Sequence, residues 1–567
     1  MKTTYIFILS IFVALSTSCT DLDLAPLSEG SSENWYSTET ELDMCVKDLY
    51  KEAFWISDAN EWSDDWIYRE TLNPITSATI NGEWGSVTSR WANLYKAIAR
   101  ANTILKNLPK AEANGVTKAK IDQFQGEVYF SRAHSYADLV SHFGDVVFLR
   151  DLIDIDEAFK MGRTDKREVI KAIYEDYDNA IALLPVKHTT SATSRATKGA
   201  ALALKARFAL YNSDWAIAAE AAKACLDLNI YELHPSYRTL FLPSTKNSKE
   251  SIFVLPRSIQ QNSYLGSEHV LNTITRCVGG WAAMDPSWDL LAAYTCTDGL
   301  PIDESPLFDP HNPFKNRDPR CTETIVEFGT EHLGVIYDPH PEVLEVMNFT
   351  TGKKQKNNDN RVNAQFASFN GLVWKKGVDK SWLDNGFKID PDKIIIRLAD
   401  VMLIYAEAMI EQNQINASVL EMVNKVRSRA YQVDYTDVSA YPAIQMGTQD
   451  ELRKVVRLER RVEFANEGLR YMDLIRWRLA EKALNRKNYG MLDPNALIEK
   501  VVKPGLWFFP LIPQIDEDGV ADFTEMEKQG FIKVLSQRVF DADKQYLWPI
   551  PSKEILINSN LTQNEGY

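Results

Sequence analysis

The sequence predicts a mainly α-helical protein in which about four stacked helical hairpins support a loop-rich, irregular lobe with few short strands. Three observations predict this class. Apolar residues recur at helical spacing over most of the chain up to about residue 230. The same spacing returns after residue 396. Between these regions, Pro, Gly, Asn, Asp and aromatic residues are frequent and the helical periodicity fades.

The N-terminal residues predict a secretory signal that ends at a cysteine. Lys2 precedes a ten-residue apolar run at residues 6–15, which is too short to span a bilayer. Small residues at 16–18 then lead into Cys19. We predict cleavage before Cys19 and acylation of its thiol and amino group, which would hold the chain to a membrane through a polar tether at residues 19–40. The alternative is an ordinary signal peptide with an incidental cysteine.

Residues 197–228 give the clearest prediction of a helical hairpin. One helix runs through AALALKARFALY, a turn follows at residues 212–214, and a second helix runs through WAIAAEAAKACLDL. Alanines alternate with large residues, so two antiparallel helices can approach closely, as in tetratricopeptide repeats. A similar pair is predicted at residues 397–411 and 417–430. One hairpin alone leaves a face uncovered, so stacking with others is expected.

These patterns divide the chain into six segments. They are a signal peptide (1–18), the tether (19–40), a first helical region (41–255), a loop-rich ligand-binding lobe (256–395), a last helical region (396–480) and a mixed C-terminal segment that packs on the body (481–567).

Composition excludes several classes of function. The formal net charge is −15 and no long basic run occurs, so nucleic acid is a poor partner. Five cysteines remain besides Cys19, without the spacing of a metal site, so we assign no metal ligand and no cofactor, and a bound metal stays open. A disulfide among Cys277, Cys296 and Cys321 stays open, because an oxidising compartment would permit it.

Catalysis is not expected. Glu459, Glu463 and Glu467 recur four residues apart beside several arginines, and two of them could be imagined as the carboxyl pair of a glycosidase. Neighbouring arginines, however, lower a carboxyl pKa, which is the wrong direction for a general acid. We therefore expect a partly buried ion network that ties helices together. No nucleophile elbow, zinc-protease, phosphate-binding or dinucleotide motif occurs.

Aromatic residues in irregular segments suggest carbohydrate binding instead. The apolar face of a pyranose ring stacks on Trp or Tyr, while its hydroxyl groups need fixed polar partners. The chain has 14 tryptophans, and several lie outside helical patterns. Trp84 and Trp281 each stand beside glycines, which cannot cover a large ring, so exposure of both is plausible.

Several stretches together resemble the SusD/RagB family of outer-membrane nutrient-uptake lipoproteins, over nearly the whole chain. They are Cys19 with TDLDLAP, GEVYFSRAHSYADLVSHFGD (126–145), RATKGAALALKARFALY (195–211), NRDPR (316–320), IIRLADVMLIYAEA (395–408), VNKVRSRAY (423–431), RLERRVEFANEGLRYMDLIRW (457–477), YLWPIP (546–551) and QNEGY (563–567). Val147 departs from the family pattern, which often has proline shortly after the Gly-Asp pair.

The resemblance implies a non-catalytic, cell-surface protein of the outer membrane that binds an oligosaccharide or polysaccharide. It also implies a SusC-like TonB-dependent transporter as partner, which the lipoprotein would cap like a hinged lid. Peptide or another nutrient is the alternative cargo, and a lipid-anchored glycosidase is a third reading. In the family, glycan contacts come from loops in the first hundred residues and near residues 270–320. The residues that this placement favours are Trp66, Trp84, Trp281, Asn81, Arg69 and Arg276.

Overall fold

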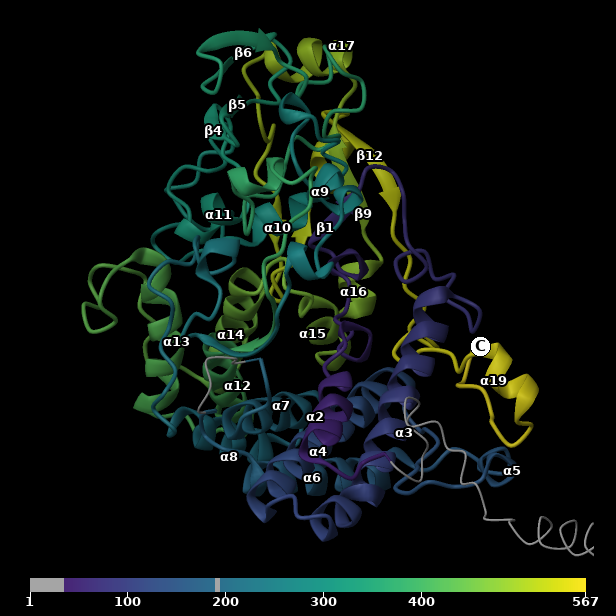
Figure 1. Ribbon diagram of the computed structural model, residues 1–567. Coiled ribbons are helices and arrows are strands. Elements are labelled where there is room, and N and C mark those ends of the chain that lie inside the picture. Colours follow the sequence, from purple (N-terminus) through teal and green to yellow (C-terminus); the bar gives the residue numbers. More distant parts are fainter. Residues whose placement is uncertain (1–34, 189–193) are drawn as a thin grey trace, which may run out of the picture.

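The computed structural model describes residues 35–188 and 194–567 and confirms the predicted fold class (Figure 1). These residues form eighteen α-helices and a set of short strands. The predicted signal peptide, Cys19 and most of the tether lie outside the described residues. None of the helices within the described ranges is both long enough and apolar enough to cross a bilayer.

A stack of helices forms the lower part of Figure 1 and continues upward at one side. Its members are α2 (Glu39–Asp48), α3 (Gly85–Ala113), α4 (Lys118–Phe143), α6 (Lys166–Leu183), α7 (Lys198–Tyr211), α8 (Trp215–Leu226), α12 (Leu398–Glu411), α13 (Ala417–Tyr431) and α14 (Gln449–Glu463). From α3 to α8 each packs on the next, and α12 packs on α8, α13 and α14. Since α8 and α12 are far apart in sequence, the residues between them form an insertion in the stack.

The hairpin of α7 and α8 shows why these residues stack. The Thr197 hydroxyl accepts a hydrogen bond from the Ala200 N–H at 3.2 Å and so caps the first turn of α7. The intervening turn places Ser213 at a φ of 61°. Alanines on the facing sides of both helices are buried, which lets the two backbones approach each other closely. Cys225 on α8 is buried among them.

The remaining elements are short. The helices are α5 (Ile155–Ala158), α9 (Ser267–Thr273), α10 (Trp288–Ala293), α11 (Pro319–Thr324), α15 (Arg470–Arg476), α16 (Ala480–Leu484), α17 (Pro494–Leu497), α18 (Thr524–Lys528) and α19 (Ser552–Ile557). The strands are β1 (Trp66–Tyr68), β2 (Ser251–Leu255), β3 (Met284–Pro286), β4 (Thr330–His332), β5 (Val335–Tyr337), β6 (Glu345–Asn348), β7 (Lys353–Lys356), β8 (Lys393–Arg397), β9 (Lys487–Met491), β10 (Gln514–Ile515), β11 (Ala521–Asp522) and β12 (Ile532–Gln537).

The strands pair only in small sheets, which is consistent with a lobe built mainly from loops. The pairs are β1–β3, β2–β8, β9–β12 and β10–β11, and β4 to β7 form one four-stranded sheet. The upper part of Figure 1 contains α9, α10, α11 and β4 to β6 of the insertion together with β9 and β12 of the C-terminal segment. The lobe therefore contains residues of both the insertion and the C-terminal segment. The six segment boundaries stay a prediction.

The helical stack and the lobe each have a large hydrophobic core. One lies in the helical stack and includes Trp55, Trp91 and Trp548. The other lies in the lobe and centres on Trp288 and Trp374. Each is made from segments distant in sequence, so neither part is a separate stretch of chain.

Candidate functional site

The pairing of β1 with β3 brings two predicted site segments together. Their antiparallel register sets Trp66 opposite Pro286 and Tyr68 opposite Met284. Because β1 ends at Tyr68, the next residue, Arg69, lies beside the chain that leads into β3. There its Nη2 atom donates a hydrogen bond to the carbonyl oxygen of Trp281 at 3.3 Å.

The chain before β3 has a backbone that presents Trp281 to solvent. Gly279 has a φ of 96°, a region that favours glycine. A Cβ on Gly280 would lie 2.2 Å from the carbonyl oxygen of Ile274, so no larger residue fits there without movement. The Trp281 N–H is held by the carbonyl oxygen of Leu271 at 2.6 Å. With its backbone fixed in this way, the Trp281 side chain remains 40% exposed.

Arg276 and Phe366 complete this surface. Arg276 Nη1 donates to the carbonyl oxygens of Trp281 at 3.4 Å and of Phe366 at 3.5 Å. The guanidinium of Arg69 lies 5.6 Å from the centre of the Phe366 ring, and Phe366 is 49% exposed. We name the surface formed by Trp281, Phe366, Arg69 and Arg276 the Trp281 platform.

The Trp281 platform combines exposed aromatic rings with guanidinium groups that are held in place. Such rings can cover the C–H face of a sugar, and the guanidinium groups can donate hydrogen bonds to its oxygens. Three of its four residues were predicted from the sequence, and Phe366 was not. The stretch RVNAQFASFN places Phe366 in a polar, irregular context, but it lacks the glycines that singled out Trp281.

Trp66 lies near the platform in the chain but is less available. It is half-buried, packs against the core of the lobe, and stacks on Tyr68 with ring centres 6.3 Å apart. Trp66 lies in β1, and the pairing of β1 with β3 places Arg69, the residue after β1. The structure therefore gives Trp66 a structural role beneath the platform, and its contact with ligand stays a prediction.

Trp84 and Asn81 lie in a different environment. Trp84 is half-buried at the start of α3, and its ring packs on Trp62 and Trp548 with centres 5.7 and 5.6 Å apart. Asn81 Oδ1 accepts a hydrogen bond from the Glu83 N–H at 2.9 Å, as expected for a turn. Among the described residues, no interaction joins either side chain to Trp281. Their role in binding stays a prediction that this geometry does not favour.

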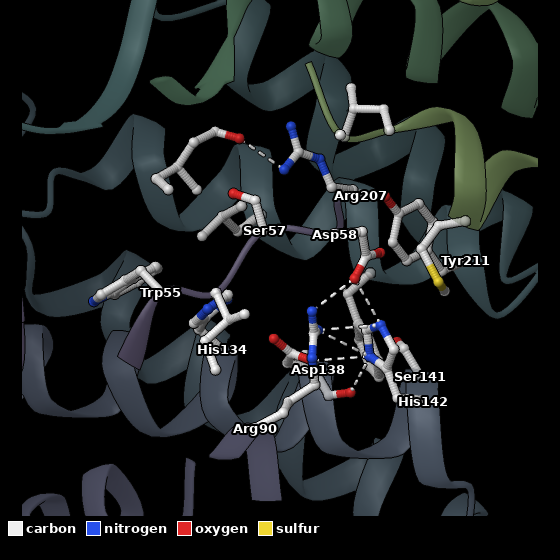
Figure 2. Close-up of a pocket in the computed structure, with 18 of the residues that line it drawn as sticks. Trp55, Ser57, Asp58, Arg90, His134, Asp138, Ser141, His142, Arg207 and Tyr211 are labelled. Carbon is white, nitrogen blue, oxygen red and sulfur yellow. Dashed lines mark hydrogen bonds and ion pairs between the residues drawn. The ribbon is translucent and has the colours of Figure 1, made fainter. Parts of the chain in front are cut away.

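A cavity inside the helical stack was considered as an alternative site (Figure 2). Its volume is about 110 Å³, well below the roughly 300 Å³ at which small-molecule sites begin. Its charged groups already have partners. Arg90 contacts Asp58 at 2.7 Å and Asp138 at 2.6 Å, and His142 contacts Asp58 at 2.9 Å. We interpret this cluster as structural, because its charges neutralise one another within the core.

The carboxylates of α14 form the predicted buried ion network. Glu463 contacts Arg397 at 2.7 Å and Arg320 at 3.1 Å, and it also pairs with Arg429. Burial alone would raise the pKa of Glu463, but these arginines outweigh burial and hold it at about 2. The four-residue spacing of Glu459, Glu463 and Glu467 predicts one helix face for all three, but α14 ends at Glu463, so Glu467 lies beyond the helix. A carboxyl group with this pKa cannot act as a general acid at neutral pH.

Asp285 is a carboxyl group near the platform with a raised pKa. Burial raises the pKa of Asp285 on β3 to about 8, although Ser368 and Arg69 oppose the shift. The side chain has no exposed surface, so it cannot reach the glycosidic oxygen of a ligand. The described residues contain no cluster of three or more His, Cys, Asp or Glu side chains suited to a metal. Cys277, Cys296 and Cys321 are unpaired.

A stack of helical hairpins that carries an aromatic platform on an inserted lobe defines a helical-repeat scaffold with an exposed aromatic surface. A family model described as "SusD family" matches residues 249–567, more than half of the chain. A second model, described as "Starch-binding associating with outer membrane", matches residues 24–210. The chain therefore belongs to the SusD family, as the sequence resemblance predicted, and the second description supports an association with the outer membrane.

Curated proteins and solved structures agree with this assignment. SusD-like protein P2 from Formosa agariphila is 24% identical, and the alignment spans 100% of this chain and 99% of the relative. The crystal structure of a SusD-like carbohydrate-binding protein from Bacteroides fragilis has a TM-score of 0.75 and 26% identity, covering 93% of this chain and 99% of that protein. A laminarin-binding SusD-like protein has a TM-score of 0.64 and 20% identity, covering 94% and 100%, and shows the shared fold.

Proposed function

We propose that this protein is a non-catalytic glycan-binding lipoprotein that captures oligosaccharide or polysaccharide at the Trp281 platform. The observation that carries the proposal is the exposure of Trp281 on a fixed backbone beside Phe366 and two guanidinium groups. The Bacteroides fragilis relative is described as a carbohydrate-binding protein, and another protein of the same fold is described as laminarin-binding. These names support glycan as the class of ligand for this chain.

The platform also explains how affinity would grow with the length of the glycan. Each ring stacked on an aromatic side chain contributes about 1 kcal/mol, which corresponds to about a fivefold change in affinity. A polymer that contacts both exposed rings is therefore retained more strongly than a single sugar that contacts one. Of the carboxyl groups discussed above, Asp285 has a raised pKa but no exposed surface, and Glu463 has a lowered pKa, so neither is suited to protonate a glycosidic oxygen, which supports a binding role.

The test is affinity gel electrophoresis with laminarin, starch and a broad panel of other polysaccharides. Trp281→Ala and Phe366→Ala should each reduce retention about fivefold on the glycan that the wild-type chain binds. Phe159→Ala is a matched control, because Phe159 is 46% exposed on a different part of the molecule. Equal retention of wild type and both platform variants would refute the site. Release of reducing ends by the pure protein would refute the binding role.

Capture would be followed by delivery to a SusC-like TonB-dependent transporter. This part of the proposal rests on family membership and on the outer-membrane association in the matching description. Co-purification of the barrel with the tagged lipoprotein from detergent-solubilised outer membranes tests it. A lipoprotein that always elutes alone would contradict the partnership.

We further propose that Cys19 carries the lipid that anchors the protein at the cell surface. The apolar run and small residues before Cys19 support this assignment. Metabolic labelling with a radioactive fatty acid should mark the wild-type protein and leave Cys19→Ala unlabelled. Equal labelling of both proteins would contradict attachment at this residue. Protease treatment of intact cells would test exposure at the surface.

A further inference from the structure

The two guanidinium groups of the Trp281 platform share a single acceptor. Arg69 and Arg276 each donate to the carbonyl oxygen of Trp281, at 3.3 and 3.4 Å, which is beyond the usual length of such bonds. Two positive groups are thus held close to each other, where they repel. The arrangement is notable in a chain with 78 acidic and 63 basic residues, because carboxylate partners are plentiful.

No carboxylate among the described residues forms an ion pair with either guanidinium. The two nearest buried acids are Asp285 and Asp359. Burial raises the pKa of both, and for Asp285 the value is about 8, so that group is mostly neutral at pH 7. Asp359 accepts hydrogen bonds from the backbone N–H groups of Arg276 at 2.6 Å and Cys277 at 3.3 Å. Neither acid therefore forms an ion pair with a guanidinium of the platform.

The exposed acid next in sequence is also engaged elsewhere. Glu70 follows Arg69 directly, but its carboxylate contacts Lys533 at 3.1 Å. The platform thus keeps two guanidinium groups without an ion-pair partner beside its exposed rings. Both groups are only half-buried, so an acidic group on a bound molecule can reach them.

The backbone holds this arrangement at an energetic cost. Arg69 has a φ of 48° and Ala282 has a φ of 41°, and both values lie in a region that residues other than glycine rarely adopt. Such conformations persist where the surrounding structure enforces them, and they concentrate at functional sites. Here the β1–β3 pairing and the 276–282 turn enforce them. The two arginines are therefore placed before ligand binds.

We propose that the ligand of the Trp281 platform is an acidic glycan, whose carboxylate or sulfate groups bind Arg69 and Arg276 while its sugar rings lie on Trp281 and Phe366. This inference rests on the proposed function and specifies its substrate class. A guanidinium only donates hydrogen bonds, so its best partner is an oxyanion that accepts two of them with charge assistance. Neutral sugars offer hydroxyl groups alone and leave the two positive charges uncompensated.

The experiment compares glycans that differ only in charge. Polygalacturonate is set against its methyl-esterified form, and carrageenan against its desulfated form, so that the two arms separate carboxylate from sulfate. A glycan array of neutral, uronate-containing and sulfated polysaccharides accompanies these affinity gels. Wild-type protein should bind at least one acidic glycan about tenfold or more tightly than the uncharged counterpart. Raising NaCl from about 0.05 to about 0.5 M should weaken that binding.

Variants assign the effect to the two arginines. Arg69→Gln with Arg276→Gln should lower binding of the acidic glycan about tenfold or more, whereas Arg69→Lys with Arg276→Lys should keep part of it through the retained charge. Arg167→Gln is the matched control, because Arg167 lies on the exposed surface of α6. Circular dichroism melting curves check that each variant is folded.

The outcomes separate this inference from the proposed function. Wild-type binding to neutral glycans alone, or equal binding to charged and uncharged forms, would overturn the inference, while loss of that binding in Trp281→Ala would uphold the glycan-binding site. Unchanged acidic-glycan binding in the double Gln variant would also overturn it. No binding to any glycan of the array would overturn the proposed function itself.

Discussion

The charge of His142 is predicted to stabilise the folded chain in a defined range of pH. The imidazole lies on α4 between the carboxylates of Asp58, at 2.9 Å, and Asp138, at 2.8 Å, with Arg90 beside it (Figure 2). Burial and Arg90 favour the neutral form, but the two carboxylates outweigh both and raise the pKa of His142 to about 9. A protonated His142 makes the group of four neutral overall.

The size of the effect follows from this pKa. The ordinary value is 6.5, so the folded chain holds the proton more tightly than the unfolded chain. The stabilisation is therefore fully present below pH 6.5 and is lost as the pH rises through about 9. Because one pKa unit corresponds to about 1.4 kcal/mol, the loss amounts to about 3 kcal/mol.

The substitution His142→Gln tests this value, because glutamine keeps a polar side chain without a titratable charge. Urea unfolding of both proteins should show a difference in free energy that is about 3 kcal/mol smaller at pH 9.5 than at pH 6. NMR titration of selectively labelled histidine should give a pKa near 9 for His142. A difference that does not change with pH, or a pKa near 6.5, would refute the reasoning.

His134, eight residues earlier on α4, serves as the matched control. Burial lowers the pKa of His134 to about 4, so this group is neutral when folded. Its contribution therefore changes in the opposite direction: stability is lost as the pH falls from 6.5 through about 4. His134→Gln should leave the pH dependence between 6.5 and 9 as in the wild type. A change in that range would contradict the assignment to His142.

Three further substitutions test the site and its support. Trp84→Ala should lower the free energy of unfolding by about 2–4 kcal/mol, because it removes a half-buried ring from an aromatic cluster, and the folded fraction should still bind glycan in an affinity gel. Glu463→Gln should lower it by about 3–5 kcal/mol in urea unfolding, because it leaves buried arginines without a partner. Gly280→Ala should weaken glycan retention as Trp281→Ala does, because its Cβ would overlap Ile274, whereas Gly266→Ala, which meets nothing within 4 Å, should retain glycan normally. Loss of glycan binding in the folded fraction of Trp84→Ala would contradict the structural role of Trp84. An unchanged free energy of unfolding in Glu463→Gln would contradict the ion network, and normal glycan retention by Gly280→Ala would contradict the role of Gly280 in placing Trp281.

The helical stack could be predicted because its signals are local. The pattern at residues 197–228 placed two helices and a turn within a few residues of α7 and α8, and the pair at 397–430 corresponds to α12 and α13. Alanine spacing determines how closely such helices pack, and that spacing is visible in the sequence itself. The family resemblance added the overall plan.

The site could be predicted only in part because its surroundings come from distant chain. Trp281 was identified by its glycines, which do govern its exposure. Trp84 has the same local context, but Trp548, far away in the sequence, covers its ring. Phe366 joins the platform through a contact with Arg276, and no local pattern specifies that contact. Local sequence therefore indicates which rings can be exposed, and tertiary packing decides which are.

The most direct measurement of the central claim is ¹⁹F NMR of the protein labelled with 5-fluorotryptophan, with the Trp281 signal assigned through Trp281→Phe. The labelled chain is titrated with oligosaccharides of laminarin, starch, polygalacturonate and carrageenan. A bound sugar should shift the Trp281 resonance, while that of Trp288, buried in the lobe core, stays in place. Shifts confined to other tryptophans, or none with any of these sugars, would contradict carbohydrate capture at this surface.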